Sequence, residues 1–231
     1  MEIGRALVLT LPVVALLVVC NNPNTRAWAR SKGIGQRTIG DVTQAYGERV
    51  KAKFQAVAAR QGVAWPPRSV TLLAFKTEKR LEVWSKGRDG RNRKLAQYPI
   101  LAASGALGPK RREGDKQVPE GLYNLPALNP NSRYHLSIKV DYPNGEDIAN
   151  KTVPRNEMGG DIFVHGDQVS IGCIAIGNPA IEEVFCLAAW ARNREIIISP
   201  VDFRTGANAT SRDQWVAGLY ARIAKKLADY R

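Results

Sequence analysis

The sequence of 231 residues is poor in side chains that bind metals or carry redox chemistry: it has two histidines, three cysteines and two methionines. A zinc site needs several closely spaced Cys or His ligands, and no Cys-x-x-Cys pair is present. The glycine and lysine patterns of dinucleotide-binding and phosphate-binding loops are missing too. We therefore predict neither a metal centre nor a nucleotide cofactor.

Long hydrophobic runs are also scarce. The run from Ala6 to Cys20 is short for a membrane-spanning helix, which takes about 20 apolar residues. It is followed by Ala27-Trp28-Ala29, the small-x-small pattern that signal peptidase cleaves. We expect residues 1–29 to be a signal peptide removed after Ala29, leaving no stable membrane span and a mature chain in the periplasm. The alternatives are an inner-membrane anchor through residues 6–20 and lipidation of Cys20, which the bulky Val19 disfavours.

Acidic residues are outnumbered, with 21 Asp and Glu against 34 Lys and Arg, which gives a formal net charge of +13. The cations are spread over the chain, with small clusters at Arg88–Lys94 and Lys110–Arg112, and lack the interleaved aromatics of single-strand nucleic-acid binders. Export also separates the chain from nucleic acid, so we expect no nucleic-acid partner. A solvated surface is the simplest interpretation, and a carboxylate-rich peptidoglycan is a compatible partner.

Hydrophobic periodicity predicts a mainly β fold with flanking helices. Helices are expected from the capping pair Asp41 and Gln44 to Gly62, over Pro179–Arg192, and over Asp213–Tyr230 after a second capping pattern at Ser211 and Gln214. The expected strands are Ser69–Phe75, Leu81–Trp84, Tyr98–Ala103, Tyr134–Val140, Asp161–Val164 and Glu195–Ser199. Two long loops, Gly105–Gly121 and Asp141–Gly160, separate these runs.

The stretch from Asp161 to Ala175 carries the clearest chemical signal. A short apolar run delivers His165, and a Ser-x-Gly-Cys turn then brings back the thiol of Cys173. An adjacent imidazole lowers a thiol pKa from about 8.5 toward roughly 3.5–7.5 and stores the proton for a leaving amine. Gly172 leaves space for a substrate and lets backbone N–H groups point at a developing oxyanion. From spacing alone, a buried structural cysteine and histidine remain an equal alternative.

These residues resemble a known family. Val164-His165-Gly166 followed by Ser170-x-Gly172-Cys173 is similar to the active-site signature of the YkuD-type L,D-transpeptidases, and the short loop with Cys173-x-Ala175 resembles the YafK-like branch. Further segments resemble that branch in the same order, from about Val63 to Ser199: Trp65-Pro66-Pro67, Phe75–Glu78, Leu81–Trp84, Gly108–Asp115, Pro119–Tyr123, Tyr134–Ser137 and Asp141–Asn144.

The resemblance implies a β-sandwich or barrel catalytic domain over residues 67–200, an N-terminal helical segment over 30–66 and a C-terminal helix over 201–231. It implies a cysteine acyl transferase that acts on peptidoglycan stem peptides, in wall biogenesis or degradation and cell shape, without metal or organic cofactor. Cys173 would be the nucleophile, forming a thioester, and His165 its base. Gly166 would orient the imidazole through its carbonyl, Ser170 would support the turn, and Gly172 with Cys173 would line the oxyanion hole.

Two positions depart from the family pattern. Where the common pattern has a histidine before the Gly-Cys pair and an arginine or asparagine two residues after the cysteine, this chain has Ile171 and Ala175. The usual substrate contacts are therefore in doubt. Weaker candidates are Lys110, Arg111 and Glu113, which could meet substrate carboxylates or ammonium groups but equally suit a solvated loop.

The remaining histidine and thiol are expected to be structural. We interpret His135 as a supporting residue in a strand, and Cys186 as a buried, inert thiol in an apolar helix that does not pair with Cys173. Two alternative functions stay open: an L,D-endopeptidase that hydrolyses a stem-peptide or wall-attached protein linkage with the same residues, and a catalytically silent wall-binding module. A basic nucleic-acid binder would require a chain that is not exported.

Overall fold

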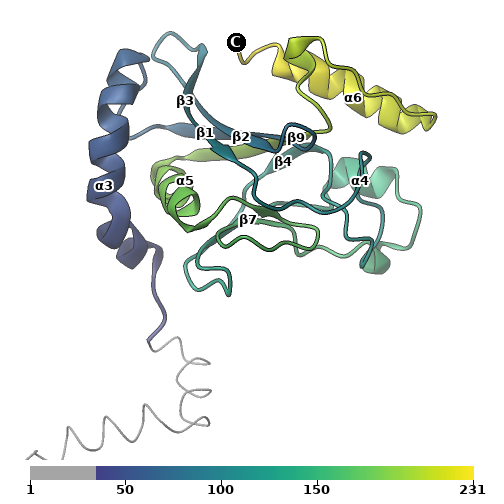
Figure 1. The fold of residues 1–231 in the computed structure, drawn as a ribbon, viewed down its shortest axis with the longest axis horizontal. Coiled ribbons are helices and arrows are strands. Elements are labelled where there is room, and N and C mark those ends of the chain that lie inside the picture. The colour runs from purple at the N-terminus through teal and green to yellow at the C-terminus, as the bar shows by residue number, and fades with distance from the viewer. Residues whose placement is uncertain (1–34) are drawn as a thin grey trace, which may run out of the picture. The chain divides into compact units, whose positions relative to one another are not determined.

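A five-stranded sheet organises the computed structural model, which describes residues 35–231; the predicted signal peptide and Cys20 lie outside the described residues. The strand order is β3-β2-β1-β9-β4. The strands are β1 (Ser69–Phe75), β2 (Arg80–Lys86), β3 (Asn92–Pro99), β4 (Gly121–Asn124) and β9 (Asn193–Ser199). β1 and β9 run parallel at the centre, and the other neighbours are antiparallel (Figure 1).

The central strand β1 is buried on both faces, which explains its unbroken apolar run. Leu73 and Phe75 pack on one side with the helix α6 (Gln214–Leu227). Leu72 and Ala74 pack on the other side, against the core that contains the helix α5 (Asn178–Trp190). Figure 1 shows α6 above the sheet and α5 with the second sheet below it. Thr38–Arg231 thus form one compact unit built in layers.

The second sheet is small and contains the stretch that carries the chemical signal. Its order is β5-β6-β7-β8. The strands are β5 (Leu128–Asn129), β6 (Ser137–Lys139), β7 (Phe163–His165) and β8 (Ile174–Ala175). The connection from β6 to β7 holds the short helices α4 (Gly145–Ala149) and η1 (Arg155–Glu157), and η2 (Phe203–Thr205) lies between β9 and α6. The fold class predicted from the sequence, mainly β with flanking helices, is confirmed.

The N-terminal helix α3 (Ile39–Arg60) packs against α5 and buries Val42, Val50 and Phe54 in the main core. Its N-cap is Thr38 and not Asp41, because Asp41 takes the third helical position and closes a capping box by accepting the Thr38 backbone N–H. No helix among residues 35–231 is long and apolar enough to cross a membrane.

Several predicted boundaries were wrong. The strand expected over Tyr98–Ala103 is β3, which ends at Pro99; its polar, half-exposed residues pair with β2 at the sheet edge, where an apolar pattern is not needed. The strand expected over Tyr134–Val140 shrinks to β6, because His135 has a left-handed φ of 71° that no strand residue adopts. α6 is capped by Asp213, whose side chain accepts the N–H of Trp215, and not by Ser211.

Candidate active site

His165 is the last residue of β7, the strand that lies between β6 and β8. Its side chain is buried, and Nδ1 lies 2.6 Å from the carbonyl oxygen of Gly166. A carbonyl only accepts, so Nδ1 carries the hydrogen and Nε2 keeps its lone pair. Burial lowers the pKa of His165 below its usual 6.5. The imidazole is therefore a neutral base at neutral pH, and the ring of Tyr134 packs over it with centroids 4.6 Å apart.

Cys173 stands directly before β8, which pairs in parallel with β7. The register Val164↔Ile174, extended by one residue, places Cys173 beside Phe163, two positions from His165 on the neighbouring strand. Ser170 holds the turn with one hydroxyl group: Oγ accepts the Cys173 N–H at 3.0 Å and donates to the Cys173 carbonyl at 2.7 Å. The topology thus brings the predicted nucleophile and base together on adjacent strands.

The thiol is neutral in this arrangement. Burial raises the pKa of Cys173 above its ordinary value, although the Phe163 backbone and the charges of Lys139 and Lys110 lower it. Sγ donates to the carbonyl oxygen of Asp161 at 3.5 Å. The expected lowering of the thiol pKa by the imidazole is thus not seen, because burial of the sulfur outweighs the charges around it. The resting pair consists of a thiol and a neutral imidazole.

The backbone donors expected to form an oxyanion hole are both engaged. The N–H of Gly172 donates to Oγ of Ser104 at 2.6 Å, and the N–H of Cys173 donates to Ser170. Oγ of Ser104 in turn donates to the Lys116 carbonyl at 2.6 Å, which ties the loop before β4 to the catalytic turn. An oxyanion would have to take these donors from the two hydroxyls. The sequence gives no signal for Ser104, which lies far from Gly172 in the chain.

Gly172 has a backbone reason to be glycine. Its φ of 85° lies in the left-handed region, and an added Cβ would sit 3.6 Å from the carbonyl oxygen of Gln117. Space alone would admit a small side chain, so the backbone conformation is the stronger constraint. The close approach of Gln117 also shows that the loop before β4 borders the turn that carries Cys173.

The three candidate substrate contacts differ in availability. Lys110 is buried, and its Nζ donates to Asp115 at 2.6 Å and to the Arg112 carbonyl at 2.7 Å. Arg111 pairs with Asp213 and lies over the Trp215 ring, 4.2 Å from its centroid. These two cations are therefore engaged in contacts that hold the loop.

Glu113 is the exposed member of the three. Its backbone N–H donates to the Glu157 carbonyl at 2.7 Å, which ties the loop before β4 to the segment around η1. The position of its carboxylate leaves it open to solvent or to a substrate ammonium group.

Apolar side chains are exposed around the nucleophile. Ile171 is 76% exposed and Val169 is 62% exposed, both in the loop between His165 and Cys173. Leu101, which is 46% exposed, lies beside β8, because its N–H donates to the Ala175 carbonyl. Three exposed apolar residues thus form an apolar rim: Ile171, Val169 and Leu101. The common family pattern has a histidine at the position of Ile171.

His135 and Cys186 occupy supporting positions. His135 Nε2 lies 2.6 Å from Glu182 of α5, and the ring meets Tyr46 of α3 edge-on. His135 thereby fixes the segment next to Tyr134, which packs on His165. Cys186 is fully buried in α5, burial raises its pKa to about 12, and both described cysteines are free thiols. Among residues 35–231, no cluster of three or more His, Cys, Asp or Glu is placed to hold a metal ion.

The fold is a two-sheet β domain in which Cys173 and His165 lie on neighbouring segments of the small sheet. The sequence model of the L,D-transpeptidase catalytic domain family, YkuD, matches residues 69–197, which run from the start of β1 into β9. The chain belongs to this family, and the resemblance seen in the sequence is confirmed.

Individual relatives cover only part of the molecule. YafK of Escherichia coli strain K12 is 39% identical over 118 residues, which make up 50% of this chain and 46% of YafK. The chain thus spans about half the length of the curated relatives it matches.

The solved structures give weaker likenesses. The structure of Pgp2 from Campylobacter jejuni, a helical cell shape determining protein, is 27% identical with a TM-score of 0.48, over 69% of this chain and 56% of that chain. L,D-transpeptidase 1 of Mycobacterium tuberculosis is 16% identical with a TM-score of 0.33, over 56% of this chain and 61% of that chain.

Proposed function

We propose that this protein is an exported cysteine acyl transferase that acts on peptidoglycan stem peptides, with Cys173 as nucleophile and His165 as base. The observation that carries the proposal is the imidazole whose Nδ1 is fixed on Gly166 and whose Nε2 is free to accept a proton, on the strand next to the thiol. Membership of the L,D-transpeptidase family supplies the substrate class.

In the first step, Sγ of Cys173 attacks the carbonyl carbon of a stem-peptide amide while Nε2 of His165 takes the thiol proton. A neutral thiol needs such a base, because only its thiolate is a strong nucleophile. The tetrahedral oxyanion then collapses, the C–N bond breaks, and the imidazolium gives its proton to the departing amine. The charges of Lys139 and Lys110 favour an anionic sulfur at Cys173, and the charge of Asp161, which pairs with Lys139, opposes them.

In the second step, an amine or water attacks the thioester carbonyl and gives a proton to His165, and the sulfur leaves and regains its proton. An amine acceptor gives transpeptidation, and water gives peptide cleavage. Ile171 and Ala175 replace residues that contact substrate in the common pattern. The largely exposed Ile171 makes the rim open, which favours water or varied amines and keeps L,D-endopeptidase activity on a stem-peptide or wall-attached protein linkage as the second candidate.

The test uses purified protein and defined muropeptides in heavy-oxygen water, read by mass spectrometry. We expect an acyl adduct on Cys173, and its loss in Cys173→Ser and His165→Gln but not in the matched control Cys186→Ser. Hydrolysis places the heavy oxygen in a new carboxylate, whereas transpeptidation gives unlabelled amide-linked dimers. A folded enzyme that forms neither product nor adduct would contradict the proposal and favour a silent wall-binding module.

The periplasmic location is part of the same proposal and rests on the leader segment and on the wall substrate of the family. N-terminal sequencing of exported protein should find Arg30 first. Intact Met1 in most of the material would indicate an inner-membrane anchor through residues 6–20.

A further inference from the structure

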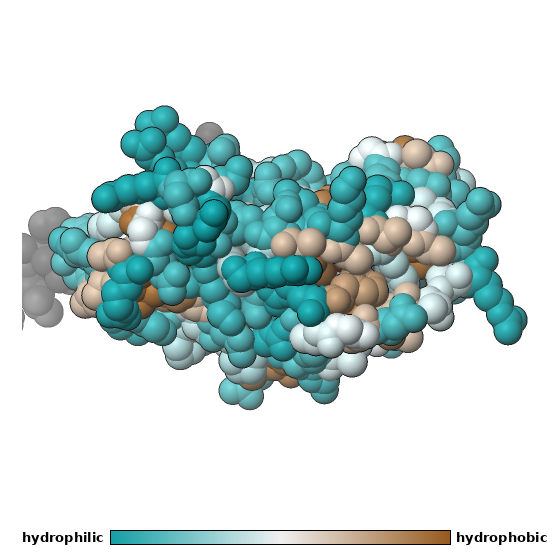
Figure 2. Space-filling view, turned by 90° about the horizontal axis from the view of Figure 1, so that it is seen from above, coloured by the Kyte–Doolittle hydropathy of each residue, from teal (hydrophilic) through white to brown (hydrophobic). Residues whose placement is uncertain are grey.

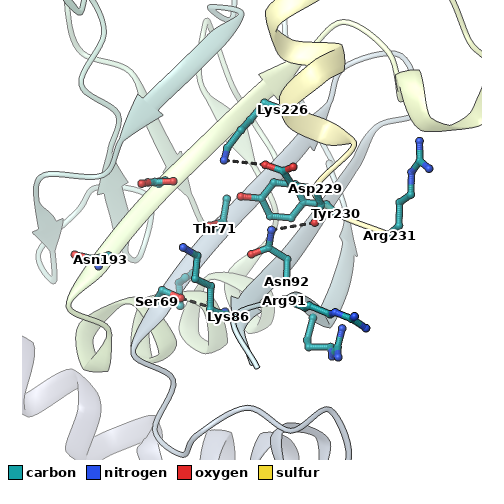
Figure 3. Close-up of a pocket in the computed structure, with 14 residues that line it drawn as sticks. Ser69, Thr71, Lys86, Arg91, Asn92, Asn193, Lys226, Asp229, Tyr230 and Arg231 are labelled. Carbon is teal, nitrogen blue, oxygen red and sulfur yellow. Dashed lines mark hydrogen bonds and ion pairs between the residues drawn. The ribbon is translucent and has the colours of Figure 1, made fainter. Parts of the chain in front are cut away.

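A polar cavity of about 580 Å³ lies on the α6 side of the five-stranded sheet, where β1 and β9 begin. Figure 3 shows its parts. Ser69 and Thr71 of β1 and Asn193 and the acidic Glu195 of β9 form the floor, the hairpin of β2 and β3 supplies one wall, and the end of α6 supplies the other. None of these elements carries His165 or Cys173, which lie in the second sheet below the five-stranded sheet in Figure 1.

The lining is positively charged. Five lining side chains are cationic and two are acidic. Two of the cations are neutralised locally, since Arg93 pairs with Asp89 at 2.7 Å and Lys226 with Asp229 at 3.1 Å. The other three, Lys86, Arg91 and Arg231, are exposed and form no ion pair within residues 35–231. Two of them, Lys86 and Arg91, flank the hairpin turn, and Arg91 belongs to the basic cluster Arg88–Lys94.

Hydrogen bonds fix both walls before any ligand arrives. The hairpin turn is closed by the Gly87 N–H, which donates to the Arg91 carbonyl at 2.7 Å, and the Lys86 N–H donates to Oγ of Ser69 at 3.2 Å. Asn92 ties the hairpin to α6 by donating from Nδ2 to the Asp229 carbonyl at 3.0 Å. The backbone that carries the free cations is thus set in advance, which reduces the entropy cost of binding.

The cavity continues over the edge of the sheet. A second cavity of about 550 Å³ shares Asn92, Arg93, Tyr230 and Arg231 with the first. Together they form a groove across the start of β3, and Figure 2, which views the molecule from this side, shows a mainly hydrophilic face. Two adjoining polar cavities suit a strand with repeated polar groups better than a single small molecule.

We propose that this basic groove, defined by the lining of the two cavities, is a second binding site for the wall polymer, which takes up its carboxylates and amides away from the nucleophile. Lys86 and Arg91 bind the carboxylates, and Ser69, Asn92 and Asn193 meet amide and hydroxyl groups. The identity of the polymer rests on the proposed function, whereas the preference for a carboxylate-bearing strand rests on the groove.

A membrane surface suits the groove less well. Among residues 35–231, the exposed large hydrophobic side chains lie elsewhere, mostly on the loops around Cys173, so the groove has none of them to insert into lipid.

The experiment measures binding of the full chain carrying Cys173→Ala, which prevents turnover, to purified sacculi by sedimentation. The groove variant is Lys86→Gln/Arg91→Gln, and the matched control, Lys51→Gln/Lys79→Gln, removes two exposed lysines elsewhere. We expect the dissociation constant of the groove variant to rise about fivefold, since exposed ion pairs contribute roughly 0.5 kcal/mol each. The control should stay within about twofold of the parent, and the difference should shrink as salt is added.

A parallel arm uses vesicles of phosphatidylglycerol and phosphatidylcholine in equal parts, and a third measures turnover of a short soluble muropeptide by the variants with Cys173 restored. Unchanged turnover beside weaker sacculus binding supports the groove. The proposal is overturned if the groove and control variants lose sacculus binding equally, if neither loses it, or if only vesicle binding is lost. If no stem peptide acylates Cys173 and the groove variant still loses sacculus binding, the proposed function fails and the groove stands.

Discussion

The buried ion pair between Lys76 and Glu120 offers a sharp test of how the loop beside the active site is held. Their charged atoms are 2.8 Å apart, and the side chains are 7% and 0% exposed. Nζ of Lys76 also donates to the carbonyls of Gly108 and Val118, and Glu120 accepts the hydroxyl of Tyr220 at 2.8 Å. One charge pair thus connects β1, α6 and the loop that borders Cys173.

Lys76→Met removes the cation and leaves a buried carboxylate with neutral donors only. Losing one partner of a buried pair costs roughly 3–5 kcal/mol, a large part of the 5–15 kcal/mol that stabilises a typical domain. Lys76→Met/Glu120→Gln removes both charges, and the amide oxygen of Gln can still accept from Tyr220. We expect the double variant to lose only about 1–2 kcal/mol, so the second substitution should recover about 2–3 kcal/mol.

Urea unfolding followed by tryptophan fluorescence measures these differences. The control is Lys79→Met on the exposed turn nearby, which should change the free energy of unfolding by less than about 0.5 kcal/mol. A double variant that is as unstable as Lys76→Met, or less stable, would refute the reasoning, because the uncompensated charge would then not be the source of the loss.

Three further predictions concern titrating groups. Burial raises the pKa of Asp147 to about 6, so the folded state gains stability as the pH falls from 6 towards 4. Asp147→Asn should remove that gain in urea unfolding at pH 4 and pH 6, and a variant that keeps it would count against the prediction. Because burial lowers the pKa of His165, the acid limb of kcat/KM for acyl transfer should have a midpoint below 6.5; a midpoint above 6.5 would show that the imidazole is not a buried neutral base. Iodoacetamide should label Cys173 long before the fully buried Cys186, and the labelling rate of Cys173 should still rise above pH 9 because burial raises its pKa. Peptide mapping measures both rates, and unfolding in urea should make them equal. Equal rates in folded protein would be inconsistent with the site.

The parts of the fold that follow from local pattern could be predicted. α5 appears as an apolar helical run, β1 as a continuous apolar strand, and the turn around Ser170 as a short motif whose hydroxyl bonds lie within three residues. β3 was misplaced because an edge strand with one solvent face does not need apolar residues. β8 was missed because two residues are too few to show a period.

The protonation state of the site also could not be predicted from the sequence. Burial of Cys173 depends on loops distant in the chain, and the hydroxyl that holds Gly172 comes from Ser104, 68 residues earlier. A motif tells which residue types meet, but the solvent exposure that sets their pKa values is a property of the assembled fold.

The parallel pairing of β1 with β9 has a consequence for the order in which the chain folds during synthesis. Residues 69–75 cannot pair with residues 193–199 until more than a hundred further residues have been made, and the whole second sheet lies between them. Closing so long a loop is slow compared with forming helices. The five-stranded sheet therefore closes only after the chain has been made as far as β9.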